Sequence, residues 1–522
     1  MIISHPGEAP GDLGRAHVII IGAGTTGLFL ADKLVQRGLT VILIESGEML
    51  ASTAPARETA VAAGRSHGGT FDGRAIGLGG ASTLWGGQLV AFDPEDFDRS
   101  YAPWPISHAD VSTHYRDVFQ RFGLKIESNR HYGRLLGGES PQGDHPIERF
   151  FTPWLPQPNF ARYFQPMIQR SPAAQICLGC TATDLELTGD RIAAVRANWR
   201  GQSWCFQGQK VVIATGTIGS IRLLLATGSS GAKPWTGHPE LGRGFQDHFS
   251  LPIGEIKLVD ERRFRDLFEN AVVAGVKLQP KLRWSRRARQ QRGPGFPGAS
   301  AMIRANSDLA EHLANLKQTA RSIGSVAGLA GLKEGPRALM GAGRNLVPFV
   351  RRYIQDRRIL SFWDKGLSMI IQAEQFPHAK SQITLAGPEQ ASDGLPKVKV
   401  EWRIRGDEVG PVADFTRAVG AYLETSGSAQ LVPNPSIFDQ GGAFLEAARD
   451  TNHPAGGARM AASAADGLVD GQLRMFGTRN LFLLSAATFP SSSHANCTFT
   501  ILALANRLGE ELIRSMATEE AA

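Results

Sequence analysis

Cysteine and long hydrophobic segments are the two things that this chain has least of. Its 522 residues include 4 cysteines, too few and too widely scattered for a disulfide framework. No uninterrupted apolar stretch approaches the ~20 residues that span a bilayer, and residues 1–15 lack the apolar core of a secretory signal. We therefore expect no transmembrane segment and a cytoplasmic location, with export alongside a signal-bearing partner as the open alternative.

Two of the cysteines, Cys177 and Cys180, have the spacing of a redox or zinc pair. They lie in a run that alternates like a strand, and no second pair of cysteines or histidines follows at the distance that a zinc site requires. We therefore expect a structural role for both and no metal site in the chain.

The chain has only a small excess of positive charge, and this excess lies in one segment. The formal net charge is +7, and residues 261–358 carry 20 lysines and arginines against 7 acidic residues, which leaves the rest of the chain net negative. Such localised basicity argues against nucleic-acid binding as the main function. We expect a mostly helical basic segment over residues 261–360 with a solvated face. The alternative is that it docks an acidic electron acceptor, an anionic substrate or a membrane surface that holds quinone.

The N-terminal part has the pattern of a strand, a glycine-rich turn, a helix and a second strand. Residues 17–21 are a short apolar run, residues 25–37 have a helical pattern, and residues 40–45 are the next apolar run. Together they predict one βαβ unit with parallel strands.

The glycines of this turn have the spacing of a dinucleotide-binding loop. Gly22 allows the tight turn, Gly24 lets the backbone approach a pyrophosphate, and Gly27 lets helix and strand pack closely. The N-terminus of the helix offers free N–H groups to the phosphates, and Glu45 is placed to accept hydrogen bonds from ribose hydroxyls. The motif does not separate FAD from NAD, and a coincidental glycine turn is the alternative.

A second glycine-rich stretch, residues 77–87, cannot form an ordinary helix. We interpret it as backbone that passes close to a ligand. Farther along, residues 176–187, 191–199 and 203–214 alternate like strands, and a helix is expected over residues 218–226.

Several motifs, in order, resemble those of the glucose-methanol-choline (GMC) oxidoreductases, a family of FAD enzymes. A single one of these motifs is weak evidence, but the ordered set runs through most of the chain. The motifs are the opening glycine loop, residues 79–82, residues 104–106, residues 242–248, His453-Pro454, residues 480–490 and Ala495-Asn496.

The resemblance implies that His453 is the active-site histidine and that Asn496 is its partner. Oxidising an alcohol moves a hydride from carbon while the hydroxyl proton leaves, and a neutral imidazole with an unperturbed pKa of about 6.5 is suited to take that proton. The amide of Asn496 would hold the substrate oxygen. His494 is the rival candidate, as a second histidine, and a histidine satisfied in a loop is the structural alternative for His453.

The resemblance also implies the residues that contact the cofactor. They are Gly22, Gly24, Thr26, Gly27, Glu45, Gly80, Ser82, Thr83, Trp85, Ala182, Thr215, Gly216, Ser485, Ala486, Asn496 and Thr498.

Two positions depart from the family pattern. Leu84 stands where pyranose oxidases have a histidine bonded covalently to the flavin, so we expect noncovalent FAD. Ser485 stands where relatives commonly have an acidic residue, which weakens the expected hold on FAD. The helix that begins near Thr498 is expected to point its positive end at the cofactor.

The expected fold is α/β, with a split Rossmann-like FAD-binding domain and a second, substrate-binding domain. Residues 15–250 and 450–522 would form the FAD-binding domain. Residues 251–449 would form the substrate domain, built on a mostly antiparallel sheet plus helices. This division follows from the resemblance.

The flavin-loop motif is most similar to that of the pyranose- and glycoside-oxidising branch of the family. The predicted reaction is therefore oxidation of a secondary alcohol of a sugar, glycoside or polyol to a carbonyl, by hydride transfer to flavin. Dioxygen, a quinone and a redox protein are all open as acceptors. Three alternatives remain: a dehydrogenase of the same fold for a sterol, aryl or natural-product alcohol, a lyase on this fold, and a non-catalytic flavoprotein.

Overall fold

A computed structural model describes the chain at residues 1–8, 13–125, 129–136, 145–229, 231–307, 352, 356–359, 361–439 and 441–521. Two large sheets and one small sheet form its framework. None of the helices in these ranges combines the length and the apolar character that crossing a bilayer demands.

The first sheet has eight strands and a parallel centre. Four neighbouring pairs are parallel, another strand pairs in parallel with β9, and an antiparallel extension completes one edge. In spatial order the strands are β1 (Ile2–Ile3), β6 (Ala174–Leu178), β3 (Val41–Glu45), β2 (Arg15–Ile21), β9 (Gln202–Ile213), β8 (Arg191–Trp199) and β7 (Cys180–Thr188), with β19 (Leu481–Leu483) beside β9.

The predicted βαβ unit is confirmed at the centre of this sheet. β2 and β3 are parallel neighbours, and helix α1 (Thr25–Val35) connects them. Residues 18–21 are at most 3% exposed, as expected for a parallel strand that is covered on both faces and therefore reads as one apolar run.

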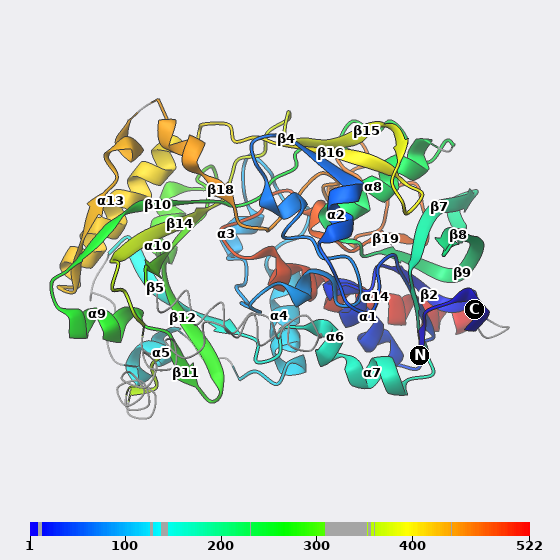
Figure 1. Ribbon diagram of the computed structural model, residues 1–522, viewed down its shortest axis with the longest axis horizontal. Helices are drawn as coiled ribbons and strands as arrows, with labels where there is room; N and C mark the ends of the chain where they lie inside the picture. Colours follow the sequence, from blue (N-terminus) through cyan, green and yellow to red (C-terminus); the bar gives the residue numbers. More distant parts are fainter. Residues whose placement is uncertain are drawn as a thin grey trace, which may run out of the picture.

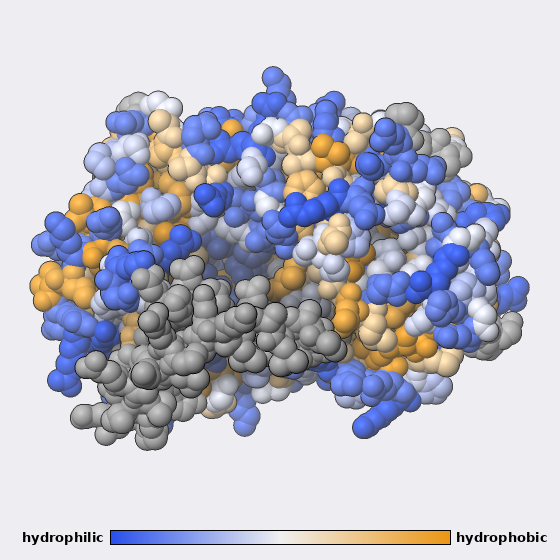
Figure 2. Space-filling model, in the orientation of Figure 1, coloured by the Kyte–Doolittle hydropathy of each residue, from blue (hydrophilic) through white to orange (hydrophobic). Residues whose placement is uncertain are grey.

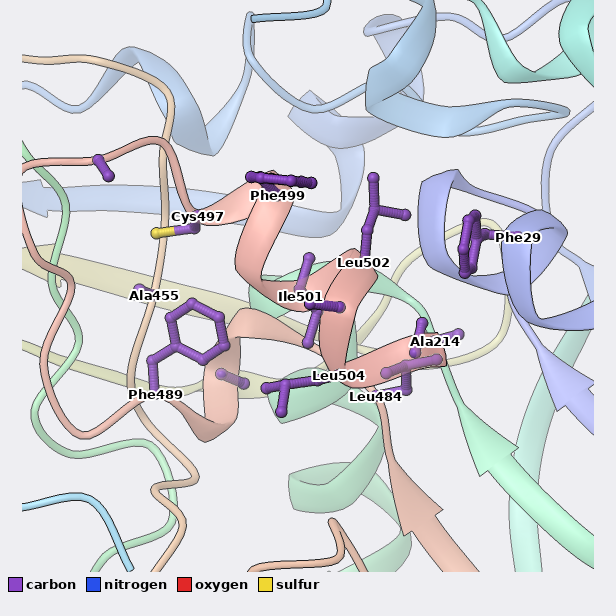
Figure 3. Close-up of a cluster of buried hydrophobic side chains, with 14 of the residues drawn as sticks. Phe29, Ala214, Ala455, Leu484, Phe489, Cys497, Phe499, Ile501, Leu502 and Leu504 are labelled. Carbon is purple, nitrogen blue, oxygen red and sulfur yellow. The ribbon is translucent and has the colours of Figure 1, made fainter. Parts of the chain in front are cut away.

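Three longer helices pack around this sheet: α14 (Cys497–Ala521), α4 (Ala109–Arg121) and α8 (Gly216–Ser229). α14 lies against both α1 and α4. Figure 3 shows apolar side chains gathered around the first turns of α14, with Phe29 of α1 and Leu484 beyond β19 among them. The C-terminal helix is thereby fixed beside the N-terminal βαβ unit.

The second sheet is antiparallel throughout. Its strands are β11 (Ala271–Val273), β12 (Val276–Trp284), β13 (Ala299–Ala305), β14 (Leu367–Ala373), β10 (Phe249–Leu258) and β17 (Ala429–Pro433), with β18 (Arg449–Asp450) beside β10 and β5 (Ile147–Trp154) beside β12. Figure 1 shows this sheet in one half of the molecule and the first sheet in the other, with both termini at the end of the first-sheet half.

The expectation of a mostly helical basic segment is wrong for residues 261–307. That part contains the helices α9 (Glu261–Phe268) and α10 (Arg286–Arg292), but strands β11, β12 and β13 occupy much of the rest. In β12 the side chains of Val276, Leu278, Leu282 and Trp284 are all buried, and they are separated by even numbers of residues. This agrees with the two-residue period of a strand. Residues 308–351 of the basic segment lie outside the described residues.

Strands β15 (Gln382–Gln390), β16 (Pro396–Trp402) and β4 (Ala60–Gly64) form the small third sheet. β4 comes from the expected FAD-binding domain but pairs with β16 of the expected substrate domain, and β5 joins the second sheet in the same way. The domain boundaries near residues 250 and 450 stay a prediction, and these two strands lie across them.

The other helices cover the edges of the sheets. They are α2 (Ala54–Thr59), α3 (Pro94–Phe97), α5 (Asn129–Leu135), α6 (Phe160–Tyr163), α7 (Gln165–Arg170) and α13 (Val409–Thr425). Figure 2 shows that hydrophilic residues cover most of one face of the molecule, with hydrophobic residues in smaller groups between them.

Candidate active site

A cavity lies where the strand ends of the first sheet meet the first turns of α1, α8 and α14. The volume of the cavity is about 270 Å³, near the lower end of the ~300–1,000 Å³ that is usual for ligand pockets.

The predicted glycine turn forms one wall of this cavity. Gly22 has φ +106°, a left-handed conformation that favours glycine. A Cβ atom on Gly27 would overlap the carbonyl oxygen of Gly22, which is the close approach of helix and strand that the sequence predicts. No side chain caps the N-terminus of α1, so its first N–H groups remain available to an anion.

Glu45 lies at the cavity with both carboxylate oxygens already accepting hydrogen bonds. The backbone N–H of Ala23 donates to Oε2 at 2.8 Å and that of Gly47 donates to Oε1 at 2.9 Å. Burial raises the pKa of Glu45, against the opposing effect of these bonds. Each carboxylate oxygen accepts more than one hydrogen bond, so the residue shapes the turn and still has acceptor capacity toward a ligand.

Most of the other predicted cofactor residues also line the cavity. They are Gly22, Gly24, Thr26, Glu45, Gly80, Ala182, Thr215, Gly216, Ser485, Ala486 and Thr498. The first turn of α14 contributes Cys497, Thr498 and Ile501, so the N-terminus of that helix does face the cavity.

Three predicted residues of the second glycine-rich stretch lie behind the cavity wall instead. The Ser82 hydroxyl donates to the Gly79 carbonyl, that of Thr83 donates to Gly80, and the Trp85 indole donates to Pro158 at 2.8 Å. Among the described residues none of the three lines the cavity. Their contacts hold the loop that presents Gly80.

The sequence analysis missed a basic group at the cavity. Arg74 lines it, and Nη1 of Arg74 is buried without a hydrogen-bond partner among the described residues. Nearby, Arg222 of α8 makes a bidentate pair with Asp393 at 2.6 and 2.7 Å. Burial, then the charge of Arg222, lowers the pKa of Arg74 to about 10, so Arg74 stays positive at neutral pH. Its position just before the glycine-rich stretch was the available signal, whereas nothing in the sequence links Arg222 with Asp393.

His453 is the predicted catalytic residue that lines the cavity. Its backbone N–H donates to both oxygens of Asp247, at 3.1 and 2.9 Å. The hydroxyl of Thr217, in the first turn of α8, donates to the carbonyl of Pro454 at 2.6 Å. These bonds fasten the His453 loop between the two large sheets.

The ring of His453 contacts a second buried histidine that the sequence analysis did not single out. Nδ1 of His453 lies 3.2 Å from Nδ1 of His248 and 2.6 Å from the hydroxyl of Thr451. Burial, followed by the charges of His248 and Lys281, holds the pKa of His453 well below 6.5. The ring is therefore neutral at neutral pH. His248 stands in residues 242–248, a motif that was noted only as part of the resemblance.

Asn496 lies beside this pair of histidines rather than on the cavity wall. The side-chain amide of Gln372 donates to Oδ1 of Asn496 at 3.4 Å and to Nδ1 of His248 at 3.3 Å. Nζ of Lys281, 4% exposed, donates to Gln88 at 3.0 Å. Gln372 of β14 and Lys281 of β12, both from the second sheet, thus lie near this pair of histidines.

His494 points away from the cavity. It is 3% exposed, its ring packs edge-on against Phe150, and Nε2 has no hydrogen-bond partner among the described residues. Asp93 and Asp96 lie close to it. Burial nevertheless lowers the pKa of His494 to about 4.

The lowered pKa of His494 predicts a loss of stability in acid. Its folded-state pKa of about 4 lies below the unfolded value of 6.5, so the contribution is complete above pH 6.5 and is lost as the pH falls toward 4. At pH 5 the loss in the free energy of unfolding, relative to neutral pH, is about 2 kcal/mol. Replacing His494 by Gln should narrow the difference between the free energies of unfolding at pH 7 and pH 5 by that amount, measured by urea unfolding. Replacing the exposed His5 by Gln should leave the difference unchanged.

The Cys177 and Cys180 side chains are both buried and free. Burial raises the pKa of Cys177 to about 12 and that of Cys180 further. Both thiols are therefore protonated at neutral pH, which agrees with the expected structural role.

Comparison with known proteins finds similarity over part of the chain. Residues 377–505 match the family model described as GMC oxidoreductase. Paromamine 6'-oxidase of Streptomyces fradiae is 30% identical over 143 residues, which is 24% of each chain. The 6'''-hydroxyparomomycin C oxidase of Streptomyces lividus is 30% identical over 136 residues, 23% of this chain and 25% of the relative. The match thus spans about a quarter of the length of these curated relatives.

Solved structures share the fold over nearly the whole chain. Pyridoxine 4-oxidase from Mesorbium loti superposes with a TM-score of 0.55 at 16% identity, over 95% of this chain and 99% of that chain. An FAD-dependent oxidoreductase from Chaetomium thermophilum gives a TM-score of 0.56 at 14% identity, over 96% of this chain and 100% of that chain. These superpositions confirm the predicted fold class.

Proposed function

We propose that the chain, whose residues 377–505 match the GMC oxidoreductase family model, is an FAD-dependent enzyme of this family that oxidises an alcohol to a carbonyl. The observation that carries the proposal is one cavity lined by both the glycine turn of β2–α1 and His453. These groups are more than four hundred residues apart in the sequence.

The cavity fits FAD in several respects. A Cβ atom on Gly80 would lie 2.9 Å from Cα of Gly24, so both backbones are bare where a pyrophosphate would pass. The open N-terminus of α1 and the unpartnered Nη1 of Arg74 offer N–H groups to phosphate oxygens. Glu45 offers acceptors to ribose hydroxyls. Leu84, 48% exposed, has no nucleophilic atom, so the cofactor is held noncovalently.

His453 acts as the base in this proposal. When bound, FAD supplies the acceptor for the hydride that leaves the alcohol carbon. The proton of the alcohol hydroxyl passes to the ring of His453, and the carbon–oxygen bond becomes a carbonyl. Asn496 is not on the wall of the cofactor cavity, and the substrate oxygen that it holds would lie on its side of His453, where the amide of Gln372 approaches Oδ1 of Asn496 at 3.4 Å. At neutral pH the ring is free to accept the proton because its pKa is held well below 6.5.

The substrate class is a sugar, glycoside or other polyol with a secondary alcohol. Two observations support the sugar or glycoside class: the flavin-loop motif of residues 79–85 and the names of two relatives, paromamine 6'-oxidase and 6'''-hydroxyparomomycin C oxidase. The secondary position of the alcohol rests on the flavin-loop motif alone. The electron acceptor is dioxygen, a quinone or a redox protein.

A single anaerobic experiment tests the proposal. The purified protein should be yellow, and acid precipitation should release its FAD into solution. A panel of sugars, glycosides, polyols, sterols and aryl alcohols is then mixed with it without oxygen, and a sugar or polyol should bleach the flavin. Readmitted oxygen restores the colour quickly for an oxidase and slowly for a dehydrogenase.

Other outcomes of this experiment contradict the proposal in distinct ways. Bleaching by a sterol or aryl alcohol alone would overturn the substrate class but keep the reaction. A yellow protein that no alcohol bleaches would point to a lyase or a non-catalytic flavoprotein. A protein that binds no FAD would overturn the proposal altogether.

A further inference from the structure

The base proposed above has two ring nitrogens, and they have different surroundings. Nδ1 of His453 lies against the Thr451 hydroxyl and Nδ1 of His248. Nε2 has no hydrogen-bond partner among the described residues, and the residue lines the cavity. A neutral imidazole carries one proton, and the nitrogen without it is the one that accepts a proton. The location of that proton therefore decides whether the nitrogen facing the cavity is a base.

The tautomer of His248 follows from its own contacts. Nε2 of His248 lies 3.0 Å from the carbonyl oxygen of Ser492, and a carbonyl oxygen only accepts hydrogen bonds. The proton of His248 is therefore on Nε2. Burial lowers the pKa of His248, so the ring is neutral and Nδ1 is an acceptor.

Gln372 requires the same assignment independently. Its side-chain nitrogen lies 3.0 Å from the carbonyl oxygen of His494, which fixes the amide with its NH₂ group on that side. The same NH₂ group lies 3.3 Å from Nδ1 of His248 and donates to it. Two backbone carbonyls thus define the direction of every hydrogen bond that reaches His248.

The direction of the hydrogen bond between His248 and His453 then follows. Because Nδ1 of His248 is an acceptor, Nδ1 of His453, at 3.2 Å, must donate. The Thr451 hydroxyl points to the same assignment. It donates to Oδ1 of Asp247 at 3.4 Å, so toward Nδ1 of His453, at 2.6 Å, its oxygen is an acceptor as well. We propose that His248 is a positioning residue that keeps the proton of His453 on Nδ1 and so leaves Nε2 unprotonated toward the cavity. This inference rests on the proposed function only in naming His453 as the base.

The chemistry of the step is consistent with this assignment. The hydroxyl proton of the alcohol forms a new bond to Nε2 of His453 as its bond to oxygen breaks. The resulting imidazolium donates from Nδ1 to the acceptor on His248, which itself remains neutral. No further proton has to move within the pair.

Histidine-selective ¹⁵N NMR tests the assignment directly, on the protein with and without cofactor. In the wild type, His453 should show a protonated Nδ1 and an unprotonated Nε2, and His248 the reverse. Free histidine in the same buffer provides the reference tautomer mixture. Replacing His248 by Leu together with Thr451 by Val removes both acceptors and should give His453 a mixture, and the rate of flavin reduction by substrate should fall by about tenfold with little change in KM.

Two further variants separate positioning from a general loss of structure. The Oδ1 atom introduced by His248→Asn takes the place of the Nδ1 acceptor, so this variant should keep the wild-type tautomer and most of the rate. Thr451→Val removes the hydroxyl but not the acceptor on His248, so the tautomer should again be that of the wild type. A wild-type His453 protonated on Nε2, a mixture in Thr451→Val alone, or a wild-type tautomer in the variant that lacks both His248 and Thr451 would overturn the inference. If the tautomers are as expected but no alcohol bleaches the flavin, the proposed function fails and the assignment stands.

Discussion

Replacing His453 by Gln should lower the rate of flavin reduction by about a thousandfold while the protein remains yellow. A positioned general base contributes ~10²–10⁴ in rate, and glutamine cannot take the proton. FAD should stay bound because the glycine turn, Glu45 and Arg74 are untouched by the change. Stopped-flow reduction under anaerobic conditions gives the rate, and the ratio of flavin to protein absorbance gives the occupancy.

The pH dependence of the rate of flavin reduction in the wild type also tests whether His453 is the base. The neutral ring is the active form, and burial beside His248 and Lys281 holds the pKa of His453 well below 6.5. The rate should therefore stay level as the pH falls from 8 to 6.5 and decline only below that range. A His453→Gln variant that reduces its flavin within tenfold of the wild-type rate would show that another group is the base.

His494→Gln is the matched control, because His494 was the rival candidate from the sequence. Its ring is buried against Phe150, outside the cavity. We expect this variant to change the rate of flavin reduction by less than about threefold, far below the ~10²–10⁴ that a general base contributes. A loss as large as that in His453→Gln would reverse the choice between the two histidines.

The parts of the fold that could be predicted from sequence are those specified by local pattern. The βαβ unit at the N-terminus combines an uninterrupted apolar strand, glycines at fixed spacing and a largely apolar helix, and all of these signals lie within thirty residues. The basic segment shows the opposite case. There the alternation in β12 was obscured by Lys281, a long basic side chain that is nevertheless 4% exposed, so charge was taken as evidence of a solvated helix.

The candidate site was predictable only where the chain itself brings residues together or the resemblance supplies them. Thr215 and Gly216 follow β9 directly and reach the cavity, as expected from their position at a strand end. Thr451, the nearest partner of the His453 ring, is two residues away, but the histidine pair depends on other elements: His248 lies just before β10, and Gln372, which contacts His248, is on β14. The pairing of β10 with β14 brings them together, and no sequence spacing records that pairing.

Ser82, Thr83 and Trp85 show how little a short motif predicts about single side chains. A short motif identifies a loop but not which of its side chains face the ligand. In this chain the hydroxyls and the indole are used to hold the loop, and the bare backbone at Gly80 faces the cavity. The motif therefore predicts the location of the loop correctly without predicting the role of each residue.

Replacing Gly27 by Ala should abolish FAD binding. A Cβ atom at this position would overlap the carbonyl oxygen of Gly22, which is backbone and cannot move aside as a flexible side chain does. The N-terminus of α1 would have to shift away from β2, and the N–H groups that face the cavity would shift with it. We expect a colourless protein with a cofactor affinity lowered by at least about a hundredfold, equivalent to about 3 kcal/mol.

The effect of Gly27→Ala has to be separated from the general effect of adding a methyl group to a helical glycine. Gly420, in the interior of α13, provides the control, because a Cβ atom there meets only Leu431, at an ordinary contact distance of 3.8 Å. Gly420→Ala should stabilise the protein by up to about 1 kcal/mol through helix propensity and leave the flavin content unchanged. Titration of each apoprotein with FAD, followed by flavin fluorescence, measures the affinity of both variants for the cofactor. Stoichiometric FAD in Gly27→Ala would mean that the turn between β2 and α1 is not where the cofactor binds, and the assignment of the cavity would fail with it.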